Sequence, residues 1–133
     1  MKISIILLAF QETDALIKDQ LTALNKQTVV PDEVILVDAS INKNFEFIFN
    51  SFSSSFKKKY ISSPGSFPGN SRNLGVSKTS NDILGFIDMK TIPVEKWIET
   101  SISSMNFYNS DYIFGSTAFE ADSSFQKVYK FCT

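Results

Sequence analysis

Two carboxylates and one arginine are the residues of this chain whose types and spacing could do chemistry. Asp38 and Asp88 each close a short apolar run, ILVD and GFID, and Arg72 is the sole arginine of the sequence. Ligands of an open α/β sheet bind just beyond the carboxyl ends of its strands, so we expect Asp88 and Arg72 to converge on one crevice, with Asp38 on the same sheet edge. One aspartate after a strand is commonly a turn or cap residue, but two at one edge beside an arginine favour a site. The chain has no histidine, so acid–base or metal chemistry would fall to Asp, Glu, Lys or Tyr.

Alternating apolar runs and helical patterns would position these residues. Continuous apolar runs predict buried strands over 2–10, 33–37 and 83–87. Shorter runs predict further strands over 59–62 and 112–115. Helical spacing predicts helices at 14–26, within 42–56, and at 70–78, 93–105 and 122–131. Gly75 lies inside one of these helices, at some cost in helix propensity. We expect an α/β fold in a single domain spanning 1–133, with an open, mostly parallel sheet and helices on both faces.

Composition and charge exclude several classes of function. A net charge of −1 and a pI of about 5.4 argue against nucleic-acid binding, and the one basic run, 57–59, is typical of a solvated surface. The apolar run of 3–10 is too short to span a membrane and lacks a signal-peptide cleavage pattern. A single cysteine, Cys132, fits a reducing compartment. We therefore expect a cytoplasmic location, in solution or at the cytoplasmic face of a membrane.

An ordered series of motifs resembles one enzyme family. The chain reads SIILLAFQ in its first strand, NKQTVVPDEVILVDAS through its second, then GNSRNLG, NDILGFIDMK and IPVEKWIE. The series resembles the donor-binding half of family 2 inverting glycosyltransferases of the GT-A fold. That family shows SVIIPTYN, a QT-x-x-P turn, VDDGS, G-x-x-x-A-R-N-x-G, F-L-D-x-D and P-x-W. The similarity covers about Lys2 to Glu99 in order and spacing.

The resemblance implies a nucleotide-sugar donor, often a uridine diphosphate sugar. It implies that Ala9 and Phe10 line the base and that Asp38 hydrogen-bonds the uridine. It places Arg72 near the nucleotide, where a guanidinium suits phosphate, and Asp88 near the ribose and a metal ion. The donor site would comprise Ala9, Phe10, Asp38, Ser40, Arg72, Asp88 and Lys90.

The departures from the family pattern lie at the same positions. Leu8 stands where the family has Pro, Gln11 where it has Asn, and Ala39 where it has a second Asp. Lys90 replaces the second Asp of D-x-D, which in relatives ligates Mg²⁺ or Mn²⁺. Asp88 is then the one ligand left to such an ion. Three interpretations are open: Lys90 neutralises the diphosphate itself, the donor binds weakly or not at all, or Lys90 is an ordinary loop lysine.

The acceptor half of the family has no counterpart in this sequence. The resemblance implies a catalytic carboxylate beyond Thr133, and the late acidic residues Glu120 and Asp122 have no spacing that marks them as that base. We therefore interpret the chain as truncated before the acceptor half, with a saccharide or lipid-linked acceptor and with homo-oligomerisation left open. A catalytically inactive GT-A-like scaffold is the alternative. A sugar-phosphate nucleotidyltransferase would need a glycine-rich loop where this chain has AFQETD.

Overall fold

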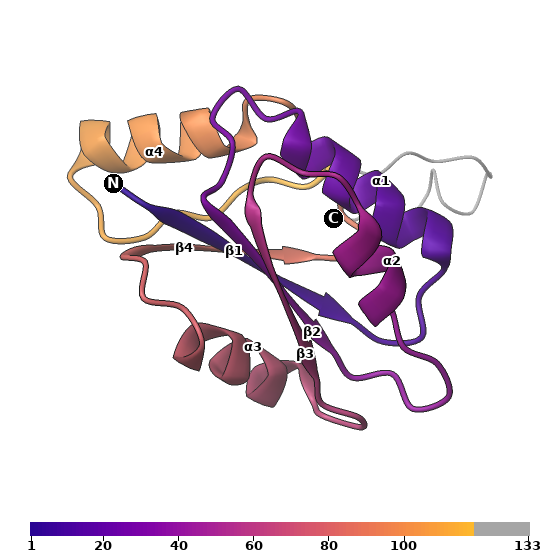
Figure 1. Cartoon of the computed structure of the whole chain (residues 1–133). Coiled ribbons are helices and arrows are strands. Elements are labelled where there is room, and N and C mark those ends of the chain that lie inside the picture. Colours follow the sequence, from indigo (N-terminus) through magenta and orange to yellow (C-terminus); the bar gives the residue numbers. More distant parts are fainter. Residues whose placement is uncertain (119–133) are drawn as a thin grey trace, which may run out of the picture.

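Four parallel strands form the centre of the protein in the computed structural model, which describes residues 1–118 (Figure 1). The strands run in the order β3-β2-β1-β4 and are β1 (Ile3–Ala9), β2 (Glu33–Asp38), β3 (Lys57–Ser62) and β4 (Ile83–Asp88). Every pairing is parallel, as a chain that alternates strands with crossover helices requires. Asp38 lies opposite Ala9 on one side and opposite Ser62 on the other, and Asp88 lies opposite Leu8. The carboxyl ends of all four strands therefore come level at one edge.

Helices cover both faces of this sheet. They are α1 (Asp14–Asn25), α2 (Glu46–Ser51), α3 (Pro68–Ser77) and α4 (Trp97–Tyr108). Helices α1, α2 and α4 pack on the face that carries Ile5 and Leu7, whereas α3 packs on the opposite face, against Ile6 (Figure 1). The α/β prediction, with a parallel sheet and helices on both faces, is confirmed.

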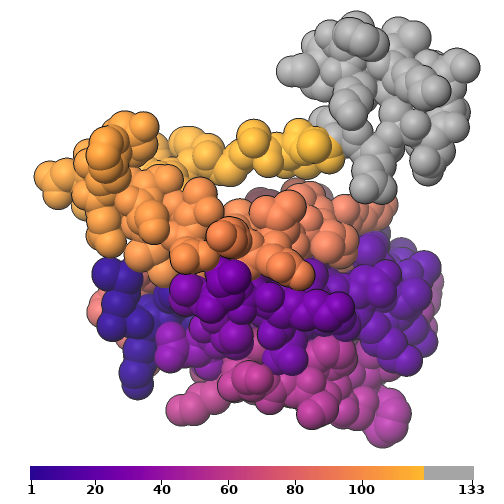
Figure 2. Space-filling view, turned by 90° about the horizontal axis from the view of Figure 1, so that it is seen from above, coloured from indigo at the N-terminus to yellow at the C-terminus, as the bar shows by residue number. Residues whose placement is uncertain are grey.

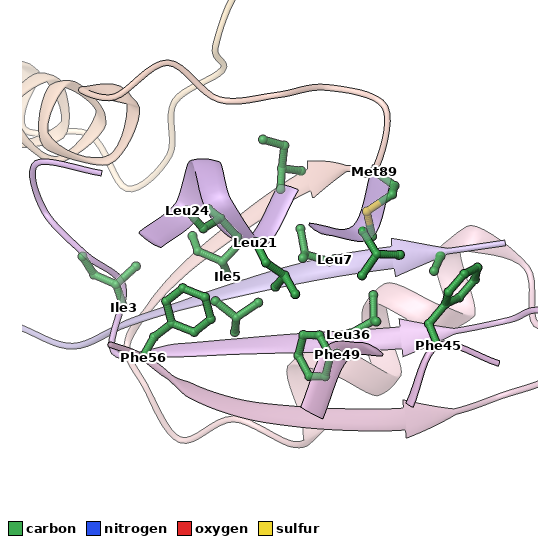
Figure 3. Close-up of a cluster of buried hydrophobic side chains, with 14 of the residues drawn as sticks. Ile3, Ile5, Leu7, Leu21, Leu24, Leu36, Phe45, Phe49, Phe56 and Met89 are labelled. Atoms are coloured by element: carbon green, nitrogen blue, oxygen red, sulfur yellow. The ribbon is translucent and has the colours of Figure 1, made fainter. Parts of the chain in front are cut away.

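The core lies between the sheet and the helices of its first face. Alternate residues of β1 and β2 meet the apolar stripe of α1, and three buried phenylalanines spread along the sheet complete the cluster (Figure 3). They are Phe45, Phe49 and Phe56. Each fully buried ring stabilises the fold by roughly 1.5–3 kcal/mol relative to an exposed one. The phenylalanine-rich stretch of 45–56 therefore supplies the bulk of the core at the β2–β3 side.

Gln27 and Thr28, the first two residues of the QT-x-x-P turn, hold α4 in place. The buried Gln27 amide donates from Nε2 to the Val94 carbonyl at 2.7 Å and accepts at Oε1 from the Ile98 N–H at 3.1 Å. Thr28 adds a backbone bond to the Glu95 carbonyl at 2.9 Å. No side chain of the residue preceding α4 caps the helix, so Gln27 supplies the acceptor that an N-terminal cap would give. The turn thereby fixes the segment that leads from the end of β4 into α4.

The basic run is part of the fold and not simply a solvated turn. Residues 57–59 begin β3, two residues earlier than predicted. The Lys58 ammonium donates to three carbonyls at the end of α2, those of Phe49, Asn50 and Phe52. Lys59 pairs with Glu33 on the neighbouring strand at 3.3 Å. Cations suit the carboxyl end of a helix, where the carbonyl groups are unpaired, so these lysines join α2 and β2 to β3.

Two expectations about the end of the chain have different outcomes. The predicted strand at 112–115 is wrong: in the described residues this segment forms no strand. Tyr112 and Phe114 stack edge-to-face at 5.7 Å, both exposed, instead of joining β4. Figure 2 shows the segment that follows α4 (yellow) as a thin extended tract. The helix predicted at 122–131 lies outside the described residues.

Helix boundaries differ from the prediction by a few residues where turns compete. Helix α4 begins at Trp97 and not at Pro93, because the preceding residues form the turn that Gln27 holds. The third begins at Pro68, two residues early, since proline is favoured in the first turn of a helix. None of the helices within 1–118 combines the length and the apolar character needed to cross a membrane.

Gly75 lets α3 approach the sheet closely, and this generates a test. A Cβ at position 75 would lie 2.7 Å from Cγ2 of Ile6 and 3.4 Å from Cγ2 of Val37, both on strands. We expect Gly75→Ala to lower the free energy of unfolding by up to about 2 kcal/mol, since overpacking costs about 1–3 kcal/mol and the gain in helix propensity offsets about 1 kcal/mol of it. Urea unfolding measures the change.

Gly69→Ala is the matched control in the same helix. A Cβ at Gly69 meets nothing within 4 Å, so this variant should be as stable as the parent or slightly more stable. Equal stability of the two alanine variants would contradict the close-packing explanation.

Candidate functional site

Hydrogen bonds join the loops that follow β1, β2 and β3. The Ala39 N–H donates to the Ala9 carbonyl at 2.8 Å, and the Gly65 N–H donates to the Ala39 carbonyl at 2.9 Å. The Gln11 N–H donates to Ser40 Oγ at 2.7 Å. These bonds continue the sheet past its strand ends, so the loops form one connected rim above the carboxyl edge.

Gln11 takes an unusual backbone conformation in this rim. Its φ is 51°, in the left-handed region that glycine and asparagine tolerate better than glutamine does. The bond to Ser40 holds the residue there. The strain gives a physical reason for the asparagine that the family pattern has at this position.

Asp38 is the buried anchor of the rim. The residue is 1% exposed, and its two carboxylate oxygens accept three hydrogen bonds from the chain. Oδ1 accepts from the Ser40 N–H at 3.0 Å, while Oδ2 accepts from the Phe45 N–H at 3.0 Å and from the Tyr60 hydroxyl at 2.7 Å. These contacts give Asp38 a positioning role. That it also accepts from the base of a bound nucleotide stays a prediction.

Tyr60 is a site residue that the sequence did not single out. It lies in β3 beside β2, so its hydroxyl reaches Asp38 from the neighbouring strand. Burial, together with the bond to the Asp38 carboxylate, raises the pKa of the Tyr60 phenol well above its usual range. One signal was available: Tyr60 is the one aromatic residue of the strand KKKYIS and directly follows its three lysines.

Arg72 and Asp88 meet at the carboxyl end of β4, the strand that pairs with β1 on the side away from β2. Nη2 of Arg72 lies 3.2 Å from Oδ1 of Asp88, with 41% and 72% of the two side chains exposed. Arg72 is in the first half of α3, and side chains on a helix lean toward its N-terminus, which here starts at the strand-end edge. The expected convergence of these two residues is confirmed. An exposed pair of this kind contributes about 1 kcal/mol or less, so a ligand can exchange for either partner.

Lys90 lies in the turn that follows Asp88. The Thr91 N–H donates to the Asp88 carbonyl at 2.9 Å and closes the turn, and Met89 is buried in the core between two exposed neighbours. Lys90 is exposed on the same turn as Asp88. Lys90 therefore follows Asp88 on one turn, two residues from the carboxylate that Arg72 contacts, with its side chain exposed.

The two residues expected to line a base differ in accessibility. Ala9 is buried and contributes its carbonyl to the rim, whereas Phe10 is 53% exposed just past the end of β1. Ile41 and Phe67 are further exposed apolar side chains in the loops after β2 and β3. The sequence patterns did not mark these two. A ring at Phe10 can stack on a planar group at the rim, with the polar residues to one side.

The residues at the end of β4 do not fit a divalent cation. Magnesium and manganese require oxygen ligands, with carboxylates the usual protein contribution. Within 1–118 the chain brings together no group of three or more Asp, Glu, Cys or His side chains that could hold a metal. At this turn the Asp88 carboxylate is already paired with Arg72, and Lys90 adds a second positive charge.

The described surface also carries two shallow hollows away from this rim. One lies between α1 and the segment before α4, near Ala23 and Pro93, and the other runs along α4 beside Phe107. Neither is lined by a residue of the predicted donor site. The candidate site is therefore the open edge of the sheet, defined by the polar groups gathered there.

Comparison with known proteins identifies a family and a fold. The model of glycosyl transferase family 2 matches residues 4–130. Among solved structures, the S. aureus TarS fragment 1–349 superposes with a TM-score of 0.72 at 20% identity, covering 93% of this chain and 39% of that one. The same fragment in complex with UDP gives the same values. The longer TarS structure gives 0.64 at 19% identity, covering 82% of this chain and 20% of that one. The chain thus spans about two fifths of TarS 1–349. No curated protein matches it significantly.

The Tyr60–Asp38 bond predicts a pH dependence of stability. A folded-state pKa raised above the unfolded value of about 10 stabilises the fold below that pH, and the contribution is lost as pH rises through the folded pKa. We expect the stability advantage of the parent over Tyr60→Phe to be full below about pH 10. Above pH 10 it should shrink by up to roughly 1.4 kcal/mol per pH unit. Urea unfolding at each pH measures this loss of stability, with phenolate absorbance as a second readout.

Tyr108→Phe, at an exposed tyrosine, is the control and should leave the pH profile unchanged. Parallel pH profiles for the parent and Tyr60→Phe would contradict the assignment.

Proposed function

The chain belongs to glycosyl transferase family 2, and on that premise we propose that its strand-end rim binds a nucleoside diphosphate sugar, with UDP as the nucleotide, for inverting glycosyl transfer. The observation that carries the proposal is the meeting of Arg72 and Asp88 at 3.2 Å, exposed at the carboxyl edge of the sheet. The UDP complex of TarS, a protein with a similar fold, supports the choice of nucleotide.

Each residue of the rim has a role in the proposed complex. The Phe10 ring stacks on the base, and Ser40 and Asp38 hold the loops that border it. The Arg72 guanidinium leaves Asp88 to pair with phosphate oxygens, since planar bidentate donors suit that geometry. Asp88 is then free to accept a hydrogen bond from a ribose hydroxyl.

The transfer step needs one group beyond those described. A base takes the proton of the acceptor hydroxyl while the oxygen forms a bond to the anomeric carbon on the face opposite the nucleotide. The bond from that carbon to the diphosphate oxygen breaks, and its electron pair leaves with UDP. No residue within 1–118 is assigned to this base, and the late acidic residues Glu120 and Asp122 lie outside the described part of the chain.

A second candidate function is binding without transfer, as a scaffold of the same fold. The observation that favours it is the D-x-D position, where Asp88 stands with Lys90 and no second carboxylate. In that case UDP and UDP-sugars would bind without turnover, or would not bind at all.

Calorimetry with UDP tests the proposed site, in buffers with Mn²⁺ and with EDTA. We expect the parent chain to bind UDP in at least one buffer and Arg72→Ala to bind it about 10–100-fold more weakly. The reason is that a charge-assisted hydrogen bond to phosphate contributes roughly 1.5–3 kcal/mol. Arg72→Lys keeps the charge but loses the paired donors, so its loss should be intermediate.

Lys57→Ala is the matched control, because Lys57 is exposed at the amino end of β3, on the opposite edge of the sheet. It should bind UDP like the parent. Thermal melting should show both Arg72 variants folded, since the ion pair that they lose is exposed. Failure of the parent chain to bind UDP in either buffer would overturn the proposal.

A further inference from the structure

We propose that this site neutralises the diphosphate of its ligand with the two cationic side chains Arg72 and Lys90 in place of a divalent metal ion. The inference rests on the proposed function, because it concerns the same site. It adds how the charge of the ligand is balanced and which residues balance it.

The charges gathered at the end of β4 favour an anion over a cation. Arg72 lies 3.2 Å from Asp88, and Lys90 follows two positions later in the same turn. Two positive groups and one carboxylate leave this corner with one net positive charge. A divalent cation would meet a single carboxylate, already paired, and would be repelled by both neighbours.

The other carboxylate of the rim cannot replace the missing ligand. Asp38 is buried, and its oxygens accept hydrogen bonds from Ser40, Phe45 and Tyr60. Turning it toward a metal would break the contacts that hold both ends of the loop between β2 and α2 and that join β2 to β3. At the turn after β4 the described chain therefore offers a single carboxylate, Asp88, to a metal.

The turn after β4 suits Lys90 for a phosphate contact. Met89 is buried in the core and the Thr91 N–H closes the turn on the Asp88 carbonyl, so the backbone that carries Lys90 is fixed. The side chain itself is exposed. A lysine ammonium on a flexible four-carbon stem acts as a compact point charge and can follow a phosphate group. Arg72 supplies the planar, directional contact from α3.

The same pair of cations would serve the transfer step. When the bond between the anomeric carbon and the diphosphate oxygen breaks, the electron pair stays on that oxygen, and the leaving UDP gains negative charge. An ammonium and a guanidinium placed beside the diphosphate stabilise this charge without transferring a proton. No co-reactant is needed beyond the donor and the acceptor hydroxyl.

The test compares UDP binding in EDTA and in Mn²⁺ for the parent chain, Lys90→Ala and Lys90→Asp. We expect the parent Kd for UDP to be equal in the two buffers within about twofold. Lys90→Ala should bind UDP about tenfold more weakly in both, while UMP, with one phosphate fewer, should be affected less. Raising the salt concentration should weaken binding to the parent more than to Lys90→Ala.

Lys90→Asp reverses the charge and restores two carboxylates. We expect it to lose UDP binding in EDTA and to recover at least part of that binding in Mn²⁺. Lys57→Ala, at the opposite edge of the sheet, should match the parent in every buffer. The melting temperatures of all these lysine variants should equal that of the parent, because Lys90 and Lys57 are exposed.

Each outcome separates the inference from the function on which it rests. UDP binding by the parent that requires Mn²⁺ would overturn the metal-free arrangement while leaving nucleotide binding intact. Equal affinity of the parent and Lys90→Ala for UDP would also overturn it, by removing Lys90 from the site. No UDP binding to the parent in either buffer would overturn the proposed function itself.

Discussion

One buried carboxylate holds together the edge of the sheet where the site lies. Asp38 is removed from water and accepts hydrogen bonds from the Ser40 and Phe45 amides and from the Tyr60 hydroxyl. A buried charge without partners would cost several kcal/mol, so the three donors are fixed where the carboxylate needs them. They come from the two ends of the loop between β2 and α2 and from β3. Through Ser40 the constraint extends to the loop after β1, whose Gln11 N–H it accepts.

The ligand-facing part of the site has the opposite character. Arg72 is partly buried and Asp88 is exposed, and one contact of 3.2 Å, which contributes little to stability, holds them to each other. Weak pairing suits groups that must exchange partners when a charged ligand arrives. Their backbones, by contrast, are fixed. The absence of a side chain at Gly75 lets α3 pack closely on the sheet, and Gln27 fixes the segment between β4 and α4. A rigid support with loosely paired charged groups is what reversible binding of a phosphate requires.

Several features of the fold were predictable because local patterns decided them. Continuous apolar runs identify β1 and β2, since a strand buried on both faces has no polar alternation. The run of β4 also predicted a strand, but β4 is an edge strand and is not buried on both faces, because Phe86 is exposed. The predicted strand at 112–115 was wrong because a short apolar run forms a strand only where a partner edge receives it. Tyr112 and Phe114 pair with each other instead. At the site, the meeting of Arg72 and Asp88 followed from the strand-end rule alone. The role of Tyr60 did not, because its contact with Asp38 crosses between strands that the sequence does not align.

The sequence by itself determined the order of elements, the parallel sheet and the family, since these depend on runs, spacings and motifs read along the chain. It also determined the charge at the position after β4, where Lys90 stands in place of a carboxylate. Only the tertiary structure decided that the Asp38 carboxylate is occupied by contacts within the chain and that Asp88 is the exposed one. The physical reason is that hydrogen-bond partners and burial come from residues distant in the sequence, which the register of the sheet brings together.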